Sequence, residues 1–307
     1  MSKRCFMFEG QGSQFQGMGR DIYDGFEPAR RVFKTGSEVL GISLEELCFD
    51  TGEERLDLTQ NSQIAVFTVS MAIYNILSEK GFKPDYYAGF SLGEYSALCA
   101  SGVVSLEDGF TIVKKRGELM QKCAEEKRGA MYAIIGLEDN VIEEVCAKTE
   151  GYVAPVNYNC PGQLVIAGDE ESAAIAAQEC MENGALKAVR LAVNGAFHSK
   201  HMEDAAKEFY EFLRGFAFNL PDGIFFSNVY GGAFIGTNIP EYLARHMTSP
   251  VLWKNEIACL VAAGCTEFYE IGCKKTLSGF NRKIDRTLST TSLSSADSIA
   301  FLDLADV

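Results

Sequence analysis

The chain has 307 residues, of which 47% are hydrophobic and 23% charged, and its formal net charge is −14. This size and composition predict a globular chain of one large or two modest domains, and the acidic charge argues against nucleic acid as a partner. No apolar run reaches the roughly 18 residues that span a bilayer, so we expect no association with a membrane.

Ten cysteines are scattered singly along the chain, with no C-x-x-C pair and no cluster with histidine. The basic N-terminus has only a brief apolar stretch before Glu9-Gly10, which is too short for a signal peptide. Without a secretory signal, single cysteines predict reduced, mostly buried thiols rather than disulfides or a zinc site. We therefore expect a cytoplasmic protein without a metal.

The first expected element is a buried strand over residues 4–8, which leads into a glycine-rich turn over residues 10–19. The spacing of Gly12 and Gly17 is that of a phosphate-binding P-loop, but the Lys-Ser/Thr pair that must follow is missing. The turn is thus not a P-loop. It still offers exposed backbone N–H groups after a strand, which suit an anion.

A helix expected over residues 62–79 precedes the most informative stretch of the chain, Gly89-Phe90-Ser91-Leu92-Gly93. A β-prone run lies just before this pentapeptide, over residues 85–88, and a helical run follows it, over residues 94–100. This context is typical of a G-x-S-x-G nucleophile elbow, in which the glycines allow a tight turn and the serine lies at a helix N-terminus. We predict that this serine is a nucleophile.

A capping sequence at Ser105 predicts another helix to about residue 123, and the chain then changes character. The expected order is strand, helix, strand, strand, helix, strand, at residues 130–136, 140–148, 153–157, 163–167, 170–183 and 187–193. That order is the ferredoxin-like arrangement. We therefore predict a large α/β domain from residues 1–128 and 197–307, with an inserted small domain at 129–196.

Beyond the small domain, helices and strands alternate again. Helices are expected at 199–213, 240–245 and 253–263, and strands at 224–227 and 267–271. Such alternation predicts a parallel sheet covered by helices. The polar run over residues 289–295 is expected to be a poorly ordered linker or a sheet edge.

A serine nucleophile needs a base, and the chain has three histidines, His198, His201 and His246. His198 follows the last strand of the small domain, at a junction of the kind that carries active-site loops in α/β folds. His201 is three residues further on, and His246 is expected at a helix C-terminus. We predict that His198 is the base, whereas capping or packing roles suit the other two.

Several motifs, in order along nearly the whole chain, resemble the malonyl-CoA:acyl carrier protein transacylases. They are Gly10-Gln11-Gly12-Ser13-Gln14, Gly89-x-Ser91-Leu92-Gly93-Glu94-Tyr95-Ser96-Ala97-Leu98, Lys115-Arg116-Gly117, Asn159-x-Pro161-Gly162-Gln163, Gly195-Ala196-Phe197-His198-Ser199 and Ser249-Pro250-Val251-x-Trp253. The resemblance implies an α/β-hydrolase-like large domain with a parallel sheet and an inserted ferredoxin-like small domain, in agreement with the element order above.

The resemblance also implies residue roles. Ser91 would be the nucleophile and His198 its base, while the backbone N–H groups of Gln11 and Leu92 would form the oxyanion hole. Arg116 would bind the malonyl carboxylate, because a guanidinium offers two parallel N–H donors to a carboxylate. The implied reaction passes malonyl from malonyl-CoA to the serine and then to the phosphopantetheine thiol of a holo acyl carrier protein, without a cofactor.

Further positions are implied to shape the site. Gln63 and Asn159 would line it, Phe197 would crowd the α-carbon of the acyl group, and the main-chain carbonyl of Leu252 would orient the base. This chain departs from the usual pattern of these transacylases at three positions. Phe90 stands in place of His, Leu252 in place of Gln, and Glu9 in place of Pro, which is expected to loosen the first turn.

Other functions remain open at this stage. A serine hydrolase would use the same elbow and an acidic third residue, for which Asp139 and Asp169 are the nearest candidates, although both fall in the small domain. A non-catalytic member would tolerate loss of Ser91 or His198. A malonyltransferase of polyketide synthesis is a further alternative. Because no carrier or ketosynthase sequence flanks the domain, we favour a free-standing enzyme of fatty-acid synthesis.

One basic cluster stands out in this acidic chain, and it consists of Lys274, Lys275, Arg282 and Lys283. Acyl carrier proteins of this type are typically acidic, so we expect the cluster to guide docking of the carrier. The alternative is a solvated charged face.

Overall fold

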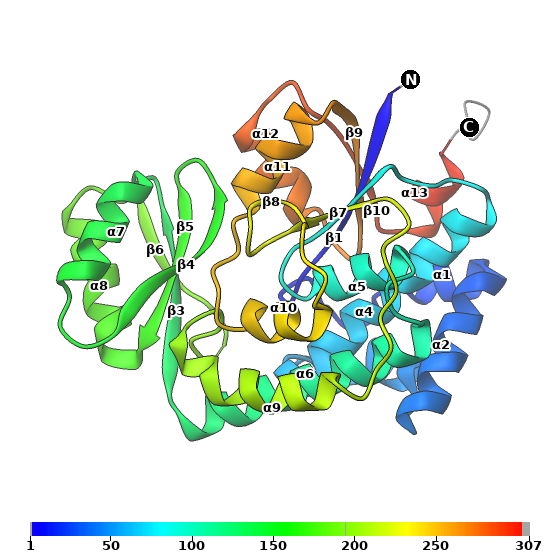
Figure 1. Ribbon diagram of the computed structural model, residues 1–307, viewed down its shortest axis with the longest axis horizontal. Helices are drawn as coiled ribbons and strands as arrows, with labels where there is room; N and C mark the ends of the chain where they lie inside the picture. The colour runs from blue at the N-terminus through cyan, green and yellow to red at the C-terminus, as the bar shows by residue number, and fades with distance from the viewer. Residues whose placement is uncertain (1, 194, 303–307) are drawn as a thin grey trace.

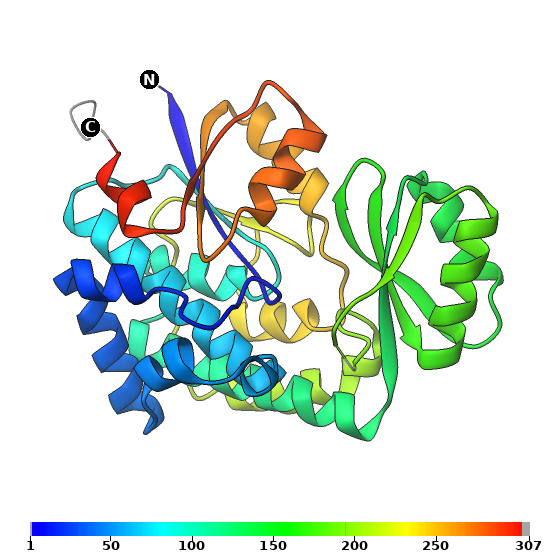
Figure 2. The same cartoon turned by 180° about the vertical axis from the view of Figure 1, so that it is seen from behind.

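Two β-sheets organise the chain, one of six strands and one of four. The computed structural model describes residues 2–193 and 195–302. In Figure 1 the small sheet, with helices α7 (Asp139–Lys148) and α8 (Glu170–Glu182), lies at one end of the molecule, and the large sheet with its helices forms the rest. Figure 2 shows the same division from behind.

The large sheet has the strand order β10-β9-β1-β2-β7-β8. Its strands are β1 (Lys3–Phe8), β2 (Tyr86–Gly89), β7 (Ile224–Ser227), β8 (Gly232–Ala233), β9 (Cys265–Ile271) and β10 (Ser289–Leu293). All neighbours pair in parallel except β7 and the short β8. The expected parallel sheet is therefore confirmed.

Strand β1 explains why both faces of the large sheet are covered. Phe6 and Phe8 point into one apolar core, while Cys5 and Met7 point into a second core on the opposite face. A strand buried on both faces is typical of a parallel sheet between helical layers.

Helices form these two layers. Their bounds are α1 (Arg20–Gly25), α2 (Glu27–Leu40), η1 (Glu46–Asp50), α3 (Glu53–Leu56), α4 (Thr59–Glu79), α5 (Gly93–Ala100), α6 (Leu106–Glu126), η2 (Lys200–Met202), α9 (Glu203–Leu213), α10 (Ile239–His246), α11 (Trp253–Ala262), α12 (Thr276–Ile284) and α13 (Ala296–Ala300). Helix α4 is buried on most sides, and it packs against α2 and α6. In the described part of the chain, no helix combines the length and apolar character needed to cross a bilayer.

The small sheet is antiparallel and has the order β4-β5-β3-β6. Its strands are β3 (Gly129–Ile135), β4 (Val153–Cys160), β5 (Gln163–Asp169) and β6 (Lys187–Arg190). Together with α7 and α8 they follow the expected order strand, helix, strand, strand, helix, strand. A separate apolar core lies between this sheet and its two helices.

The differences from the expected elements have local causes. Strand β6 ends at Arg190, earlier than predicted, although the N–H of Leu191 still donates to the carbonyl of Met131 in β3. Of the two alternatives for the polar run over residues 289–295, the sheet edge is confirmed, because the run contains strand β10, which pairs with β9. Helix α2 was not predicted, although a proline in its first turn and Gly41 at its C-terminus, with φ 68°, mark its ends.

The turn after strand β2 brings two main chains unusually close together. A Cβ on Gly89 would lie 2.1 Å from the carbonyl carbon of Gly93, and a Cβ on Gly93 would lie 2.0 Å from the carbonyl oxygen of Phe8. Neither position has room for a side chain. The two glycines of the G-x-S-x-G pattern are therefore required by the packing of helix α5 on strands β1 and β2.

We expect Gly93→Ala to lower the urea midpoint of unfolding, because the added Cβ would meet backbone atoms that have no rotamer to move to. Overpacking of this kind costs roughly 1–3 kcal/mol or more. Gly279→Ala is the matched control, since Gly279 lies inside α12 with open space around it and should gain about 0.5–1 kcal/mol. An unchanged midpoint in Gly93→Ala would contradict this close packing.

Candidate active site

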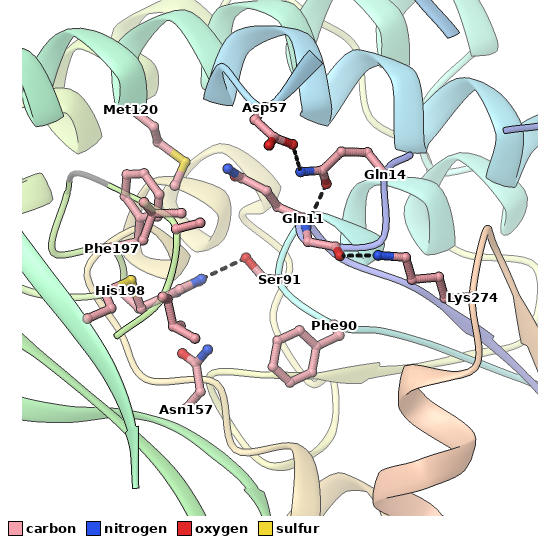
Figure 3. Close-up of a pocket in the computed structure, with 15 residues that line it drawn as sticks. Gln11, Gln14, Asp57, Phe90, Ser91, Met120, Asn157, Phe197, His198 and Lys274 are labelled. Atoms are coloured by element: carbon pink, nitrogen blue, oxygen red, sulfur yellow. Dashed lines mark hydrogen bonds between the residues drawn. The ribbon is translucent and has the colours of Figure 1, made fainter. Parts of the chain in front are cut away.

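Ser91 and His198 meet at the carboxyl end of the large sheet. The Ser91 hydroxyl oxygen lies 2.7 Å from Nε2 of His198 (Figure 3). The φ angles of these two residues are 52° and 60°, and they are the only positive φ angles among the described residues other than glycine. Two strained residues in hydrogen-bond contact are typical of a functional site.

The main chain fixes the tautomer of His198. Its Nδ1 lies 3.0 Å from the carbonyl oxygen of Ser249 and 3.1 Å from that of His246. Because carbonyl oxygens only accept hydrogen bonds, Nδ1 carries the proton and Nε2 is free to accept from the serine hydroxyl. Burial, and then the positive charge of Arg116, lower the pKa of His198 to about 4. The imidazole is therefore a neutral acceptor at physiological pH.

The expected role of Leu252 is wrong. Its carbonyl oxygen accepts the N–H groups of Asn255 and Glu256, which open helix α11, and is committed to that helix. The carbonyls that reach His198 come from Ser249 and His246 instead. Sequence alone does not reveal this, because the two carbonyls depend on how the chain turns between α10 and α11.

Two backbone N–H groups lie close to the serine without an acceptor of their own. They belong to Gln11, in the turn after β1, and to Leu92, at the start of α5. Neither donates a hydrogen bond to another described residue. The neighbouring N–H of Ser91, in contrast, donates to Oδ1 of Asn228 at 2.7 Å. Strands β1 and β2 are adjacent, so their turns end side by side.

Arg116 is a buried cation beside the serine. Only 1% of it is exposed, and burial lowers the pKa of its guanidinium. Its Nη1 donates to Oε1 of Gln63 at 2.8 Å, its Nη2 lies 3.1 Å from the Ser91 oxygen, and its guanidinium packs over the Tyr95 ring. It makes no ion pair with any described residue, and its Nε has no partner. The site thus holds a desolvated positive charge without an anion.

Gln63 holds this arginine rather than lining the pocket. It is fully buried, and its Nε2 donates to Oε1 of Gln11 at 3.3 Å. The side chain therefore links Arg116 to the turn that carries one of the free N–H groups. The expectation that Gln63 lines the site is therefore wrong: it does not belong to the cavity wall, and it contacts Arg116 and Gln11, which lie around the serine.

The serine opens into a cavity of about 420 Å³ between the two sheets. Its walls are Gln11, Gly12, Gln14, Asp57, Phe90, Ser91, Met120, Met131, Asn157, Leu191, Ala192, Val193, Phe197, His198 and Lys274. These residues come from the turns of the large sheet, from α6, and from the small sheet with the segment that follows it (Figure 3). Phe197 lies in the wall as expected.

Asn159 is not part of this wall, contrary to the sequence expectation; Asn157 of the same strand takes that place. Strand β4 shifts its register between Pro155 and Asn157 and again between Tyr158 and Cys160. A strand with such irregularities does not alternate simply between its faces, so residue types alone could not distinguish the two asparagines.

Phe90 and Lys274 give the cavity two features that the sequence analysis did not foresee. Phe90 lines it and packs against Trp253 and Phe280, with ring centroids 5.8 and 5.9 Å away, so it forms an aromatic wall. Lys274 lies at the rim, where its Nζ donates to the carbonyl oxygen of Gly12 at 3.1 Å.

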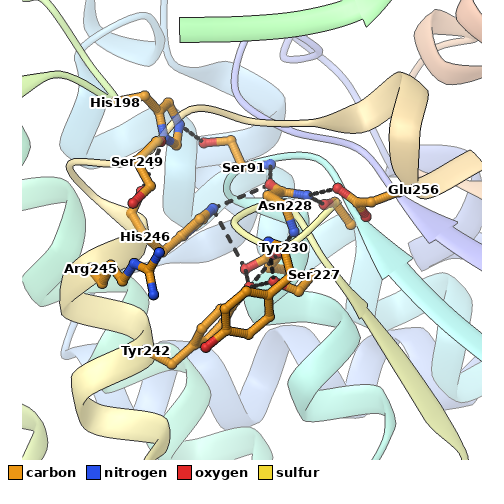
Figure 4. Close-up of polar contacts among 12 residues, drawn as sticks. Ser91, His198, Ser227, Asn228, Tyr230, Tyr242, Arg245, His246, Ser249 and Glu256 are labelled. Atoms are coloured by element: carbon orange, nitrogen blue, oxygen red, sulfur yellow. Dashed lines mark hydrogen bonds and ion pairs between the residues drawn. The ribbon is translucent and has the colours of Figure 1, made fainter. Parts of the chain in front are cut away.

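A buried polar network lies beneath the serine turn (Figure 4). Its centre is Asn228, whose Oδ1 accepts from the Ser91 N–H at 2.7 Å and from Nε2 of His246 at 3.2 Å. Its Nδ2 donates to the carbonyl of Gly89 and to Oε1 of Glu256, both at 2.7 Å. Asn228 therefore fixes both sides of the strained turn.

Two fully buried carboxyl groups belong to this network, those of Glu94 and Glu256. Burial raises the pKa of Glu94 to about 8 and holds the pKa of Glu256 well above its usual range. Tyr242 donates to Glu94 at 2.8 Å. Since a buried carboxylate without a cation is costly, both groups hold their protons near neutral pH.

The remaining acidic and histidine candidates lie elsewhere. Asp139 pairs with Lys254, and Asp169 lies 2.8 Å from Nε2 of His201. Neither aspartate contacts His198, so they do not complete a triad. His246, the last residue of α10, contacts the site through its carbonyl and through Asn228, and its ring packs edge-on against that of His198, with centroids 5.3 Å apart.

Comparison with known proteins gives a consistent result. The family profile described as acyl transferase domain matches residues 5–297. A malonyl CoA-acyl carrier protein transacylase of Bacillus subtilis is 40% identical over 97% of this chain and 96% of its own length.

Two solved structures are similarly close. A malonyl CoA-acyl carrier protein transacylase of Clostridium perfringens has a TM-score of 0.93 and 39% identity, over 97% of this chain and 95% of that one. A complex of a holo acyl carrier protein of a type II polyketide synthase with its malonyl-transacylase has a TM-score of 0.94 and 36% identity. The match covers 97% of this chain and 98% of that one.

Proposed function

Since this chain belongs to the acyl transferase family, and within it to the malonyl-CoA:acyl carrier protein transacylases, we propose that it transfers malonyl from malonyl-CoA to an acyl carrier protein. The observation that carries the proposal is Arg116, a buried cation without an anion, 3.1 Å from the Ser91 hydroxyl. A carboxylate at the far end of the acyl group would supply the missing charge.

The first half-reaction acylates the serine. His198 accepts the proton of the Ser91 hydroxyl through Nε2 while the oxygen attacks the thioester carbonyl. The negative charge that forms on the carbonyl oxygen is held by the N–H groups of Gln11 and Leu92, which have no other acceptor among the described residues. The carbon–sulfur bond then breaks, and coenzyme A leaves as a thiol with the proton from His198.

The second half-reaction runs the same steps in reverse order. The phosphopantetheine thiol of the carrier gives its proton to His198 and attacks the malonyl-serine ester, and the serine leaves with that proton. An ester and a thioester are close in free energy, so the transfer is reversible. No cofactor takes part in the proposed steps.

Transfer to a thiol is favoured over hydrolysis by the surroundings of the base. A serine hydrolase of this elbow type uses a carboxylate on the second histidine nitrogen. Here two main-chain carbonyls take that place, from Ser249 and His246. The serine-hydrolase alternative therefore has no support from the described residues.

We assign the activity to fatty-acid synthesis. The similarity to a complex of a polyketide carrier with its malonyl-transacylase supports a second candidate, supply of malonyl to a polyketide synthase. The chemistry of the two is the same, so the carrier alone distinguishes them.

The architecture fits an α/β-hydrolase-like large domain, residues 1–128 and 197–307, with a ferredoxin-like insert at 129–196. The strand order β4-β5-β3-β6 with both helices on one core supports the second description. We further propose a cytoplasmic location, because reduced thiols suit that compartment; all ten cysteines are free.

The basic cluster is well situated to guide the carrier. Lys274 lies at the cavity rim, and Lys283 reaches from α12 to Oε1 of Gln163 in the small domain at 3.1 Å. Together with Lys275 and Arg282, which are exposed, these residues border the approach to the cavity from the α12 side. An acidic carrier would meet complementary charge there.

We expect Ser91→Ala to abolish the malonyl adduct on the intact protein, because in the described part of the chain no other hydroxyl forms a hydrogen bond with the base. His198→Ala should slow its formation by several orders of magnitude. Mass measurement after mixing with malonyl-CoA tests both. Ser70→Ala, a buried serine on α4 whose hydroxyl has no partner, is the control. A malonyl adduct in Ser91→Ala would overturn the assignment.

We expect Arg116→Ala to reduce kcat/KM for malonyl-CoA and to leave that for acetyl-CoA unharmed or improved. Leaving the substrate carboxylate unpaired in a desolvated pocket costs on the order of 2–5 kcal/mol, whereas acetyl has no carboxylate. Lys115→Ala is the matched control, since this neighbour on α6 pairs with the exposed Glu208. Equal losses for both substrates would mean that Arg116 is structural.

Charge reversal in the basic cluster, as in Lys275→Glu with Arg282→Glu, should raise the KM for the carrier protein and leave that for malonyl-CoA unchanged. The effect should be larger at low salt, because screening is weaker there. Lys34→Glu with Lys187→Glu, at two exposed positions outside the cavity wall, is the control with the same change in net charge. An unchanged KM for the carrier would identify the cluster as a solvated face.

A further inference from the structure

Glu9 is a fully buried acid next to the turn that carries Gln11. It directly follows strand β1, and its side chain extends to the segment between β9 and α12. There its Oε2 accepts the N–H groups of Cys273 at 2.5 Å and Lys274 at 2.9 Å. Its own N–H donates to the carbonyl of Ile271 at 3.3 Å. Side chain and main chain of one residue thus bind the same neighbouring segment.

Glutamate in place of proline was expected to loosen this turn, but Glu9 ties the turn to the segment after β9. A proline would offer neither an N–H nor acceptor oxygens, whereas Glu9 provides both. The contact is also tight, because a Cβ on Gly272 would lie 2.3 Å from Oε2 of Glu9. The two segments are therefore held at a fixed separation.

A second link joins the same two segments nearer the cavity. Nζ of Lys274 donates to the carbonyl oxygen of Gly12 at 3.1 Å, while the Lys274 N–H is held by Glu9. Gln11 lies between these two attachment points and lines the cavity together with Ser91, and its N–H has no acceptor among the described residues. The position of that N–H thus depends on how the Glu9 carboxyl group is bound.

We propose that Glu9 is a positioning residue for acyl transfer, whose ionised carboxylate holds the turn that presents the Gln11 N–H to the oxyanion. The inference rests on the proposed function, because it assumes that this N–H stabilises the transition state. Glu9 touches neither the serine nor the base, so it acts through the backbone of its own turn.

The groups around Glu9 make its protonation sensitive to pH in the working range. From β9 the carboxyl group of Glu270 faces it, and from the following segment come the Cys273 thiol and Lys274. Burial, and then repulsion from Glu270, raise the pKa of Glu9 to about 7. Above that pH the carboxylate accepts both N–H groups; below it a proton occupies one oxygen and weakens the link.

Acylation should therefore slow as the pH falls through about 7, where His198, with its pKa near 4, is still neutral. The two groups give separate steps on the acid side of the profile. The step near pH 7 reports the ionisation of Glu9, and the step near pH 4 reports the protonation of His198.

The experiment measures single turnovers of malonyl-enzyme formation over a range of malonyl-CoA concentrations, from about pH 5 to about pH 9. The pH steps are taken from the rate constant at low malonyl-CoA, because that constant reports the pKa values of the free protein. Glu9→Gln keeps the size and one acceptor oxygen but does not ionise. It should lose the step near 7, form the adduct roughly tenfold more slowly at high pH, and leave the half-saturating malonyl-CoA concentration unchanged. Glu270→Gln removes the neighbouring charge, so its step should move to lower pH.

The inference is overturned if Glu9→Gln keeps the step near 7 or if its plateau rate equals that of the unaltered protein. It is also overturned if Glu270→Gln leaves the step where it was, which tests the idea even when Glu9→Gln does not fold. Failure of the proposed function would look different, because the unaltered protein would then form no adduct that Ser91→Ala abolishes.

Discussion

The hydrogen bond between Ser91 and His198 depends on how the chain passes through the small sheet. The two residues are 107 positions apart in the sequence, and the small sheet with α7 and α8 lies between them. Its first and last strands, β3 and β6, pair directly with each other. The chain therefore leaves and returns at one place, and the segment after β6 brings the base over the turn that holds the serine. The pairing of β3 with β6 thus helps to place His198 next to Ser91.

The buried ionisable groups near Ser91 lie on two sides of the serine turn. Beneath the serine turn, Glu94 and Glu256 are buried without a cation of their own, and burial keeps them protonated near neutral pH. Neutral acids can serve as hydrogen-bond partners for Asn228 without placing negative charge below the oxyanion. Above the turn, Arg116 is buried as a cation. The field at the serine therefore favours an incoming negative charge.

Sequence reasoning was most successful where a residue type is dictated by local backbone geometry. The elbow around Ser91 was predicted from its two glycines, and the structure shows that neither has room for a Cβ. It failed where a role depends on a carbonyl or on strand register. The sequence pointed to Leu252 and Asn159, whereas the structure has Ser249 and Asn157 in those places. Any residue type can supply a main-chain carbonyl, and no residue type marks the register shifts of β4, so neither difference could be predicted. The role of Arg116 was predicted from the resemblance to the transacylases. From its spacing alone, this residue would be interpreted as part of an exposed, charged helix face.

The low pKa of His198 connects substrate choice to the strength of the base. After burial, the charge of Arg116 is the largest cause of that low value. A carboxylate paired with Arg116 would offset this charge, so the pKa of His198 would rise toward its usual range when a malonyl group is bound. A more basic imidazole takes the serine proton more readily. In the proposed reaction the substrate carboxylate thus does more than increase affinity, because it also strengthens the base that takes the proton of the attacking Ser91 hydroxyl. An acyl group without a carboxylate would meet the same serine with a weaker base, and discrimination would appear in kcat as well as in KM.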